Sequence, residues 1–428
     1  MRRLRSRRPV ATLLAAGLAA QIAVVGLASG LASADPAPPP PTPVPPNGSP
    51  SPFPSVLHTP AAAVARPTVH AGAALLVDLA SGDVLYSKDA DRPRPIASLT
   101  KVMTAVVVLE HADLHDVVRV DSRAVFEDDD YGASSTVGLR PGERLTVRQL
   151  LGAMLVGSAN DAADALAIHV SGSIDAFVAL MQRRARQLGM ARTRFMSANG
   201  LDDRGRSTPN DLVLLARAAV STPGFAELTA TKVVAIRSPH RAPRRIQNRN
   251  VLLWLYRGAF GMKTGSTAQA GYCLIGTAER DGRQLVTIVL HAPGEAFSDA
   301  ATLLNYGFDG FERRTLVREG EDVGVVSLPG GDVPVVTGAS LERLVPVELE
   351  DDIRRRVRVN PTAAFPPAPG DAVATLVMSA PGLDLGRVPL IAPTIPAPPP
   401  ENGVPWWARA LGAIGRAAGD AVGAVAGG

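Results

Sequence analysis

The first candidates for chemistry are a serine and a lysine three residues apart, Ser98 and Lys101. The segment from Ser98 to His111 is nearly all apolar around its circumference, which predicts a buried helix. Residues three apart on a helix share a face, so the Lys101 amine can reach the Ser98 hydroxyl. Burial lowers the pKa of a lysine, which suits a general base, and backbone N–H groups at the helix N-terminus can hold an oxyanion.

The second candidate is the tripeptide Ser158-Ala159-Asn160, which lies in a break between two predicted helical segments. The Ser158 hydroxyl could relay a proton between a base and a leaving group. The Asn160 amide could hydrogen-bond both the lysine and a substrate carbonyl. A structural alternative makes Asn160 the N-cap of the helix that follows.

The third candidate is the run Lys263-Thr264-Gly265-Ser266, which leads into a predicted pair of strands. A cation on a strand beside two hydroxyls suits a substrate carboxylate, and Gly265 would let substrate backbone approach the strand. The chain has only four lysines, Lys88, Lys101, Lys232 and Lys263. Two of the four lysines therefore stand in these candidate motifs.

The three motifs occur as S-x-x-K, S-x-N and K-T-G, with 60 and then 105 residues between their first positions. In this order and spacing they resemble the penicillin-recognising serine acyltransferases. The resemblance is closer to the serine-type D-Ala-D-Ala carboxypeptidases, which are low-molecular-mass penicillin-binding proteins like those of peptidase family S11. It extends over residues 70 to 310 and includes Pro95-Ile96-Ala97, Gly142-Glu143, Asn160-Asp161, Asn199-Gly200-Leu201 and Ala270-Gly271-Tyr272.

The resemblance implies a β-lactamase/transpeptidase-like α/β (α+β) fold with an antiparallel sheet flanked by helices. It implies that Ser98, deprotonated by Lys101, attacks the carbonyl between the two terminal D-alanines of a peptidoglycan stem pentapeptide. Ser158 would protonate the leaving D-alanine, and water would hydrolyse the acyl-enzyme. The implied substrate-binding residues are Asn160, Lys263, Thr264, Gly265 and Ser266, with the N–H groups of Ser98 and Ser266 as the oxyanion hole. No metal or other cofactor is expected, and β-lactams would acylate the same serine.

Several alternatives share these motifs. A class A β-lactamase adds a glutamate in an E-x-x-L-N sequence, and this chain has no glutamate between Glu143 and Glu227. A D,D-endopeptidase that cuts peptidoglycan crosslinks uses the same residues and stays open. A non-catalytic wall-binding scaffold is disfavoured because the motifs are intact. Arg249 could add a carboxylate contact, although a structural role is the alternative.

The elements that must position these residues can be predicted from patterning. β-Hairpins are expected at 73–88 and at 272–290, the second through Asp281-Gly282. Thr146 and Gln149 form a capping-box pattern ahead of an apolar helix. Another helix is expected over 176–188. Short Val-rich runs after 313 predict a small all-β domain.

The remaining sequence predicts export. Five arginines in the first eight residues precede an apolar stretch that ends in Ala32-Ser33-Ala34, the layout of a secretory signal peptide; an uncleaved membrane anchor is the alternative. Cleavage after Ala34 would turn the formal charge of +4 into −1, so nucleic acid is not an expected partner. The domains expected are 1–34 signal peptide, 35–66 Pro/Ala-rich linker, 67–312 acyltransferase, 313–395 small β domain and 396–428 linker and tail. Helical spacing of apolar residues in that tail is typical of a helix that contacts a membrane surface; a loose tail is the alternative.

Overall fold

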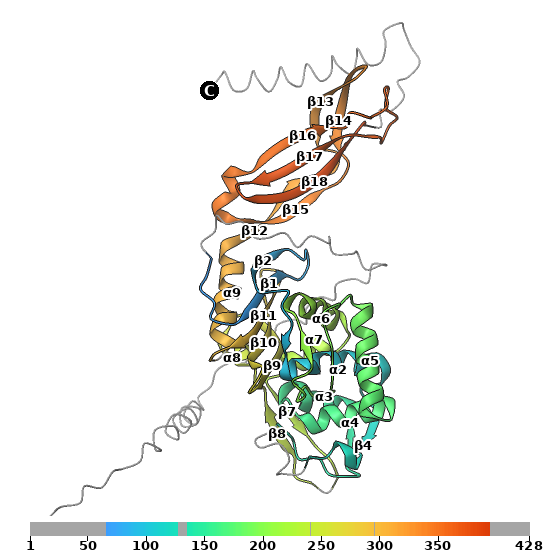
Figure 1. Cartoon of the computed structure of the whole chain (residues 1–428), viewed down its shortest axis with the longest axis vertical. Coiled ribbons are helices and arrows are strands. Elements are labelled where there is room, and N and C mark those ends of the chain that lie inside the picture. Colours follow the sequence, from blue (N-terminus) through green and yellow to red (C-terminus); the bar gives the residue numbers. More distant parts are fainter. Residues whose placement is uncertain (1–65, 127–134, 240, 295, 394–428) are drawn as a thin grey trace, which may run out of the picture. The chain divides into compact units, whose positions relative to one another are not determined.

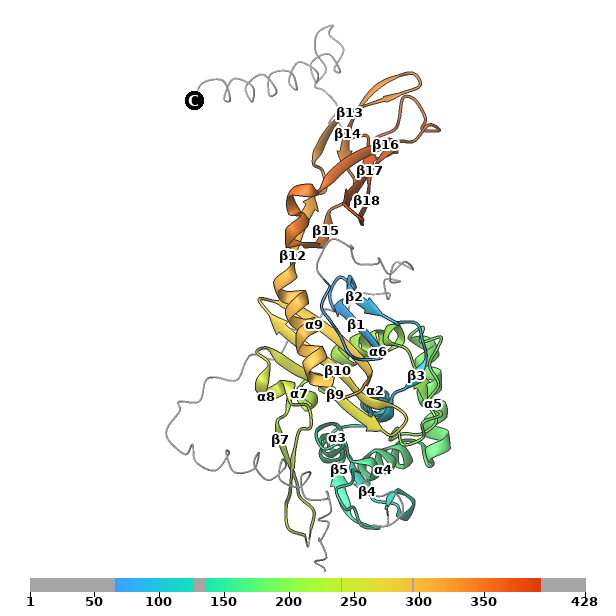
Figure 2. The same cartoon turned by 60° about the vertical axis from the view of Figure 1, so that its left-hand side comes forward.

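The computed structural model describes residues 66–126, 135–239, 241–294 and 296–393. The expected signal peptide, nearly all of the linker 35–66 and the tail 396–428 lie outside these residues. Their roles stay predictions, as do the domain boundaries. Figures 1 and 2 show the elements that surround the candidate site.

A five-stranded antiparallel sheet forms the centre of the part that carries the three motifs (Figure 1). In spatial order its strands are β2 (Val84–Lys88), β1 (Ala73–Asp78), β11 (Arg283–Ala292), β10 (Gly271–Arg280) and β9 (Ala259–Thr267). Both predicted hairpins are confirmed, and Asp281 and Gly282 turn the second one with φ of +50° and +73°. Positive φ at both turn residues matches the twist of the flanking strands.

Both faces of this sheet are covered by helices, which explains why every residue of β1 is buried. Ala73, Leu75 and Val77 pack into a core with α2 (Thr100–His111) and its neighbours. Ala74 and Leu76, on the opposite face, pack against α9 (Ala296–Gly310). Side chains alternate between the faces of a strand, so one apolar run serves two cores. The predicted antiparallel sheet flanked by helices is confirmed.

The helical part on the α2 side consists of short helices. They are α3 (Val147–Val156), α4 (Asn160–Ser171), α5 (Ile174–Gln187), α6 (Pro209–Ser221) and α7 (Phe225–Ala230). Of these, α3, α5 and α6 have side-chain N-caps. The predicted capping box is confirmed, because Thr146 and Gln149 satisfy each other's backbone N–H groups at the start of α3. Helix α5 begins earlier than expected, because Ser173 accepts from the Ala176 N–H and caps it.

The start of the buried helix differs from the prediction. Ser98 lies in a 3-10 turn, η1 (Ala97–Leu99), and α2 begins only at Thr100. Ala97 has a φ of +46°, a left-handed conformation that is unfavourable for a residue with a Cβ. The nucleophile candidate therefore stands on a sharp turn at the head of the helix.

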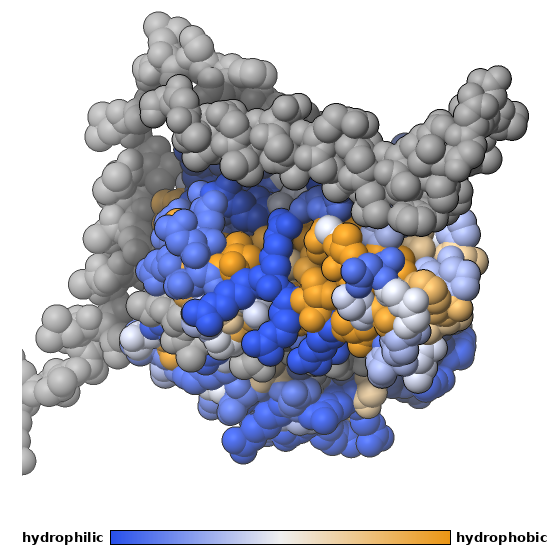
Figure 3. All heavy atoms as spheres, turned by 90° about the horizontal axis from the view of Figure 1, so that it is seen from above, coloured by the Kyte–Doolittle hydropathy of each residue, from blue (hydrophilic) through white to orange (hydrophobic). Residues whose placement is uncertain are grey.

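The region after α9 contains strands and one 3-10 turn, as predicted for an all-β region. Strands β12 (Phe311–Val317) and β15 (Leu341–Pro346) pair with each other. A five-stranded sheet has the order β13 (Asp322–Leu328), β14 (Gly331–Thr337), β18 (Leu383–Ile391), β17 (Ala372–Ala380) and β16 (Arg354–Val359). Figure 3 shows apolar residues gathered among hydrophilic ones on the face in view.

Three further pairs of short strands complete the described topology. They are β3 (Arg94–Pro95) with β6 (Arg206–Ser207), β4 (Val117–Arg119) with β5 (Arg144–Thr146), and β7 (Val233–Ile236) with β8 (Arg244–Gln247). The short helix α8 (Leu252–Leu255) precedes β9. No single helix within the described ranges is long and apolar enough to span a membrane; by length and composition alone, one bent pair, α4 with α5, would qualify.

Candidate active site

The buried Lys101 amine is the centre of a hydrogen-bond cluster. Its Nζ donates to Ser98 Oγ at 2.9 Å, to Asn160 Oδ1 at 2.7 Å and to the backbone oxygen of Asn199 at 2.5 Å. The side chain is 0% exposed. An ammonium has three protons to donate, so these three acceptors fix its direction. The predicted pairing of Ser98 with Lys101 is therefore present.

The surroundings of Lys101 prepare it to act as a base. Burial is the largest cause that lowers its pKa, from the ordinary 10.5 to about 7, and the charge of Arg249 acts in the same direction. The carboxylates of Asp164 and Asp161 oppose that change. A pKa near neutrality leaves much of the amine free to accept the Ser98 proton.

The second motif spans the end of the loop between α3 and α4 and the first residue of α4, Asn160, which lies against Lys101. Ser158 has a φ of +64°, a left-handed backbone that turns its side chain back into the site. The N-cap of α4 is Ala159, so the alternative in which Asn160 caps the helix is wrong. Asn160 is the first residue of α4, and its side chain accepts from Lys101 while its backbone N–H donates to the Ser135 oxygen at 2.7 Å.

Lys263 on β9 links the third motif to the second. Its Nζ donates to Ser158 Oγ at 3.0 Å and to the Thr264 oxygen at 2.8 Å. Burial, followed by the positive charges of Lys101 and Arg249, holds the pKa of Lys263 well below its usual value. The positive charge of Lys101 thus disfavours a proton on Lys263, whose Nζ lies beside Ser158.

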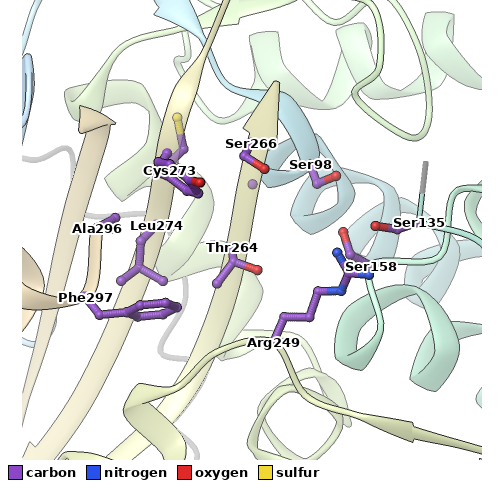
Figure 4. A pocket seen from close by; sticks show the side chains of 12 residues that line it. Ser98, Ser135, Ser158, Arg249, Thr264, Ser266, Cys273, Leu274, Ala296 and Phe297 are labelled. Carbon is purple, nitrogen blue, oxygen red and sulfur yellow. The ribbon is translucent and has the colours of Figure 1, made fainter. Parts of the chain in front are cut away.

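The hydroxyls of the three motifs open into one cavity of about 190 Å³ (Figure 4). Ser98, Ser158, Thr264 and Ser266 line it, whereas the two lysines lie behind these hydroxyls. Figure 4 shows Arg249 reaching toward Ser158 on the side of the cavity opposite Leu274, Ala296 and Phe297. The cavity therefore has a polar wall with a guanidinium and an apolar wall.

Gly265 brings β9 against the turn that carries Ser98. A Cβ at position 265 would stand 2.9 Å from the Ser98 nitrogen and 3.1 Å from the Leu99 nitrogen. Real Cβ atoms do not approach backbone this closely, so only glycine fits. The sequence reasoning expected Gly265 to admit substrate backbone, whereas the structure gives contact with the enzyme's own backbone as a reason for glycine.

Sequence reasoning underrated Arg249. Its neighbours Asn248 and Asn250 are buried and bind the backbone of Thr229, Thr231 and Gly261, which fixes the loop. The Arg249 N–H donates to the Val156 oxygen at 3.2 Å, so the exposed side chain extends from a rigid support into the cavity. The Asn-Arg-Asn pattern was the available signal, because buried asparagines on either side present the residue between them.

Two further residues of the site, Ser135 and Asn199, belong to none of the three sequence motifs. Ser135 lines the cavity on a segment held by Asp161, whose carboxylate accepts from the N–H groups of Val137 and Leu139 at 3.0–3.2 Å. Asn199 contributes a backbone oxygen, which no side-chain motif can predict. Asn199-Gly200-Leu201 is one of the segments that carry the resemblance, but the sequence predicted no role for Asn199.

Cys273, which lines the cavity, is not a reactive thiol. Burial raises the pKa of the Cys273 thiol to about 11, so it stays protonated and unreactive at neutral pH. Among the residues that the structure describes, no three His, Cys, Asp or Glu side chains are grouped so that they could hold a metal ion.

Comparisons with known proteins agree with this geometry. Residues 60–294 match the family model for D-alanyl-D-alanine carboxypeptidase, peptidase family S11. The chain is 38% identical over 257 residues to D-alanyl-D-alanine carboxypeptidase DacB2 of Mycobacterium tuberculosis, covering 58% of this chain and 86% of that protein. It is 34% identical to the D-alanyl-D-alanine endopeptidase of Escherichia coli, over 58% of this chain and 81% of that one.

Among solved structures, the D-alanyl-D-alanine carboxypeptidase DacD from Francisella tularensis superposes with a TM-score of 0.69 and 25% identity. The match covers 77% of this chain and 94% of that one, so it extends past the acyltransferase part. The predicted fold class is confirmed. The chain belongs to the D-alanyl-D-alanine carboxypeptidases of peptidase family S11.

Proposed function

We propose that this protein is an exported serine D,D-carboxypeptidase that removes the terminal D-alanine from peptidoglycan stem pentapeptides. The observation that carries the proposal is the contact between Lys101 Nζ and Ser98 Oγ, 2.9 Å long, at the edge of the cavity. A serine in contact with a buried amine whose pKa is about 7 is a nucleophile with its base.

Acylation begins when Ser98 Oγ attacks the carbonyl carbon between the two D-alanines and its proton passes to Lys101. A bond forms between Oγ and carbon, and the oxyanion is held by the N–H groups of Ser98 and Ser266. The close approach of residue 265 to the Ser98 nitrogen supports this role, because it sets the two backbone segments side by side. The carbon–nitrogen bond then breaks.

The departing D-alanine needs a proton on its nitrogen, and Ser158 supplies it. Ser158 Oγ lines the cavity and accepts a hydrogen bond from Lys263, which supports a relay from buried amine to leaving group. The proton that Lys101 took passes to Ser158, because Ser98 Oγ is bonded to carbon at this stage and has no proton to pass on. Water then attacks the acyl-enzyme with Lys101 as base, releasing a tetrapeptide and free Ser98.

The terminal carboxylate of the substrate meets the polar wall of the cavity. Thr264 and Ser266 present hydroxyls there, and Arg249 presents a guanidinium. An arginine can bind a carboxylate with two parallel hydrogen bonds. Lys263 lies behind these groups and adds positive charge, while Asn160 holds Lys101 and Gly265 lets β9 pass Ser98. β-Lactams carry a similar carboxylate and acyl group, and we expect them to acylate Ser98.

A D,D-endopeptidase is the second candidate function. The relative from Escherichia coli that bears this name supports it, since it is 34% identical to this chain over 257 residues. Cleaving a crosslink replaces D-alanine as leaving group by a longer peptide. The same residues can perform both reactions.

The proposed setting is outside the cytoplasm. Peptidoglycan lies there, and the arginine-rich, apolar N-terminal segment ending in Ala32-Ser33-Ala34 supports export. We further propose that the tail 396–428 contacts the membrane surface, on the strength of its apolar residues at helical spacing.

The test is to incubate the mature full-length protein with a peptide that ends in D-Ala-D-Ala and to measure free D-alanine. We expect release by the wild type and none by Ser98→Ala. Release that survives Ser98→Ala would overturn the assignment. Crosslinked muropeptide dimers, supplied in parallel, separate the two candidate functions: monomers would form from dimers only if the protein is an endopeptidase.

A further inference from the structure

Asp164 is a buried acid that the proposed reaction does not use. It lies on α4 one turn after Asn160, so both side chains leave the same face of the helix. Asp164 is 4% exposed, and a carboxylate in such a place needs a partner. It is therefore a candidate for a role in the site.

The partner is Asn199, the residue whose backbone holds Lys101. Asn199 Nδ2 donates to both Asp164 oxygens, at 3.1 and 2.9 Å. The backbone oxygen of Asn199 accepts from Lys101 Nζ at 2.5 Å, and its Oδ1 accepts from the Leu201 N–H at 2.9 Å. Asp164 thus fixes the side chain of a residue whose carbonyl is one of the three acceptors of Lys101.

A second cavity brings Asp164 within reach of protons from solution. It measures about 500 Å³, and Arg123, Asp164, Ser197, Asn199 and Asp202 are among its lining residues. Burial, the largest cause, raises the pKa of Asp164 to about 7, against the effects of Asn199 and the Lys101 charge. The carboxyl can therefore change its charge in the pH range in which Lys101 does.

We propose that Asp164 is a positioning residue for acylation: it holds Asn199 in the conformation that orients Lys101, and its negative charge opposes deprotonation of that lysine. The inference rests on the proposed function, because it assigns a role through Lys101. Asp164 touches neither Ser98 nor the cavity lined by Ser98.

The charged groups around Lys101 and Asp164 determine in which direction the loss of the Asp164 charge moves the pKa of Lys101. Lys101 on α2 is surrounded by Asp161 and Asp164 from α4, Lys263 from β9 and Arg249 from the loop before α8. Asp164 is influenced by Lys101 and Asp161, and Arg123 and Asp202 share its cavity. Removing the Asp164 charge leaves Lys101 with fewer negative neighbours, so the free amine forms at lower pH.

The test measures the rate of acylation by a fluorescent penicillin from pH 5 to 9. The variants are Asp164→Asn, which keeps the size and one acceptor, and Asp164→Ala, which keeps neither. Asp211→Asn is the matched control, because Asp211 on α6 is also buried and accepts from the Arg192 N–H and Thr193 Oγ1 but is not among the groups that shift Lys101. Thermal melting checks the fold of each variant.

The acid limb is the part of the pH profile in which the acylation rate falls as pH decreases. We expect the acid limb of Asp164→Asn to move to lower pH and become steeper, because the coupled titrations of Asp164 and Lys101 are replaced by that of Lys101 alone. The midpoint of the limb should move by about half a pH unit, whereas at its foot, where Asp164 is protonated in the wild type as well, the two rates relative to their plateaus should converge. Asp164→Ala should lose about tenfold at the plateau, because Asn199 is no longer held. Asp211→Asn should keep the wild-type limb.

An unchanged or alkaline-shifted limb in Asp164→Asn, or the same shift in Asp211→Asn, would overturn the inference. A folded Asp164→Ala protein whose acylation rate reaches the wild-type plateau would overturn the proposal that Asp164 positions Asn199. If Asp164→Ala does not fold, the Asn variant decides alone. Failure of the proposed function looks different, because the wild type itself would then not be acylated at any pH.

Discussion

Lys263 Nζ donates to the hydroxyl of Ser158, 3.0 Å away, and so ties the third motif to the second. The bond from Lys101 to Asn160 ties the first motif to the second in the same way, at 2.7 Å. The three motifs are therefore one hydrogen-bonded unit, in which both buried amines bond residues of the second motif. A substitution in one motif should therefore alter the position or the pKa of groups in the other two.

Ser158→Ala removes the hydroxyl on which the proton relay depends. We expect the acylation rate by a fluorescent penicillin to fall by about 100-fold or more, the usual range for loss of a general acid–base group. Ser327→Ala, which removes an exposed hydroxyl bonded to Asp332 in the small β region, is the control and should leave the rate unchanged. A Ser158→Ala protein that labels at the wild-type rate would remove Ser158 from the mechanism.

The lowered pKa of Lys101 predicts the pH dependence of acylation. Below about 7 the amine is protonated and cannot accept the Ser98 proton, so the rate should fall as pH decreases and level off above that value. The Lys101→Arg variant should show no labelling across pH 5 to 9, because a guanidinium stays protonated. A flat profile in the wild type would contradict a role for Lys101 as base.

Asn160→Asp places a negative charge at the acceptor that lies 2.7 Å from Lys101 Nζ. The charge favours the ammonium, so the acid limb should move to higher pH by about one unit, with about tenfold loss of rate below the limb. Aspartate is favourable in the first turn of a helix, so we expect the Asn160→Asp protein to fold. A shift to lower pH would contradict the assigned electrostatics.

Gly265→Ala should damage the site through sterics alone. The new Cβ would meet the Ser98 nitrogen at 2.9 Å, so β9 or the Ser98 turn must move, at a cost of about 1–3 kcal/mol. We expect at least about tenfold slower acylation. Gly310→Ala at the end of α9 is the control, because its nearest neighbour, a Tyr306 side-chain carbon, would be 3.9 Å away.

Arg249→Leu should raise KM for a D-Ala-D-Ala peptide by about tenfold or more and change kcat less, because a carboxylate contact is lost. Arg249→Lys should recover part of the loss. Arg245→Leu removes an exposed arginine from strand β8, just before the Asn248–Asn250 loop, and should leave KM unchanged. Equal effects of the two leucine variants would point to general charge rather than to a contact made by Arg249.

Much of this site could be predicted from the sequence because its chemistry is carried by side chains at fixed spacing. Ser98 and Lys101 are three apart near the head of an apolar helix, and the pairing follows from helical geometry. The hairpin at Asp281-Gly282 and the capping box at Thr146 follow from local backbone preferences. Each of these signals acts within a few residues.

The parts that escaped prediction depend on segments far apart in the chain. The backbone oxygen of Asn199 reaches Lys101 across 98 positions, and a carbonyl has no identity in a sequence. Gly265 was assigned to substrate access, because its approach to Ser98 is visible only once β9 is placed beside the 3-10 turn. Asp164 had no motif, and its importance comes from its burial beside Asn199.

The central claim is that Ser98 is the nucleophile activated by Lys101. The most direct test is to incubate the full-length protein with benzylpenicillin, digest it and locate the covalent adduct by mass spectrometry. The account predicts one adduct, on Ser98, that is absent from both the Ser98→Ala and the Lys101→Arg proteins. An adduct on any other residue, or one that forms equally in Lys101→Arg, would contradict it.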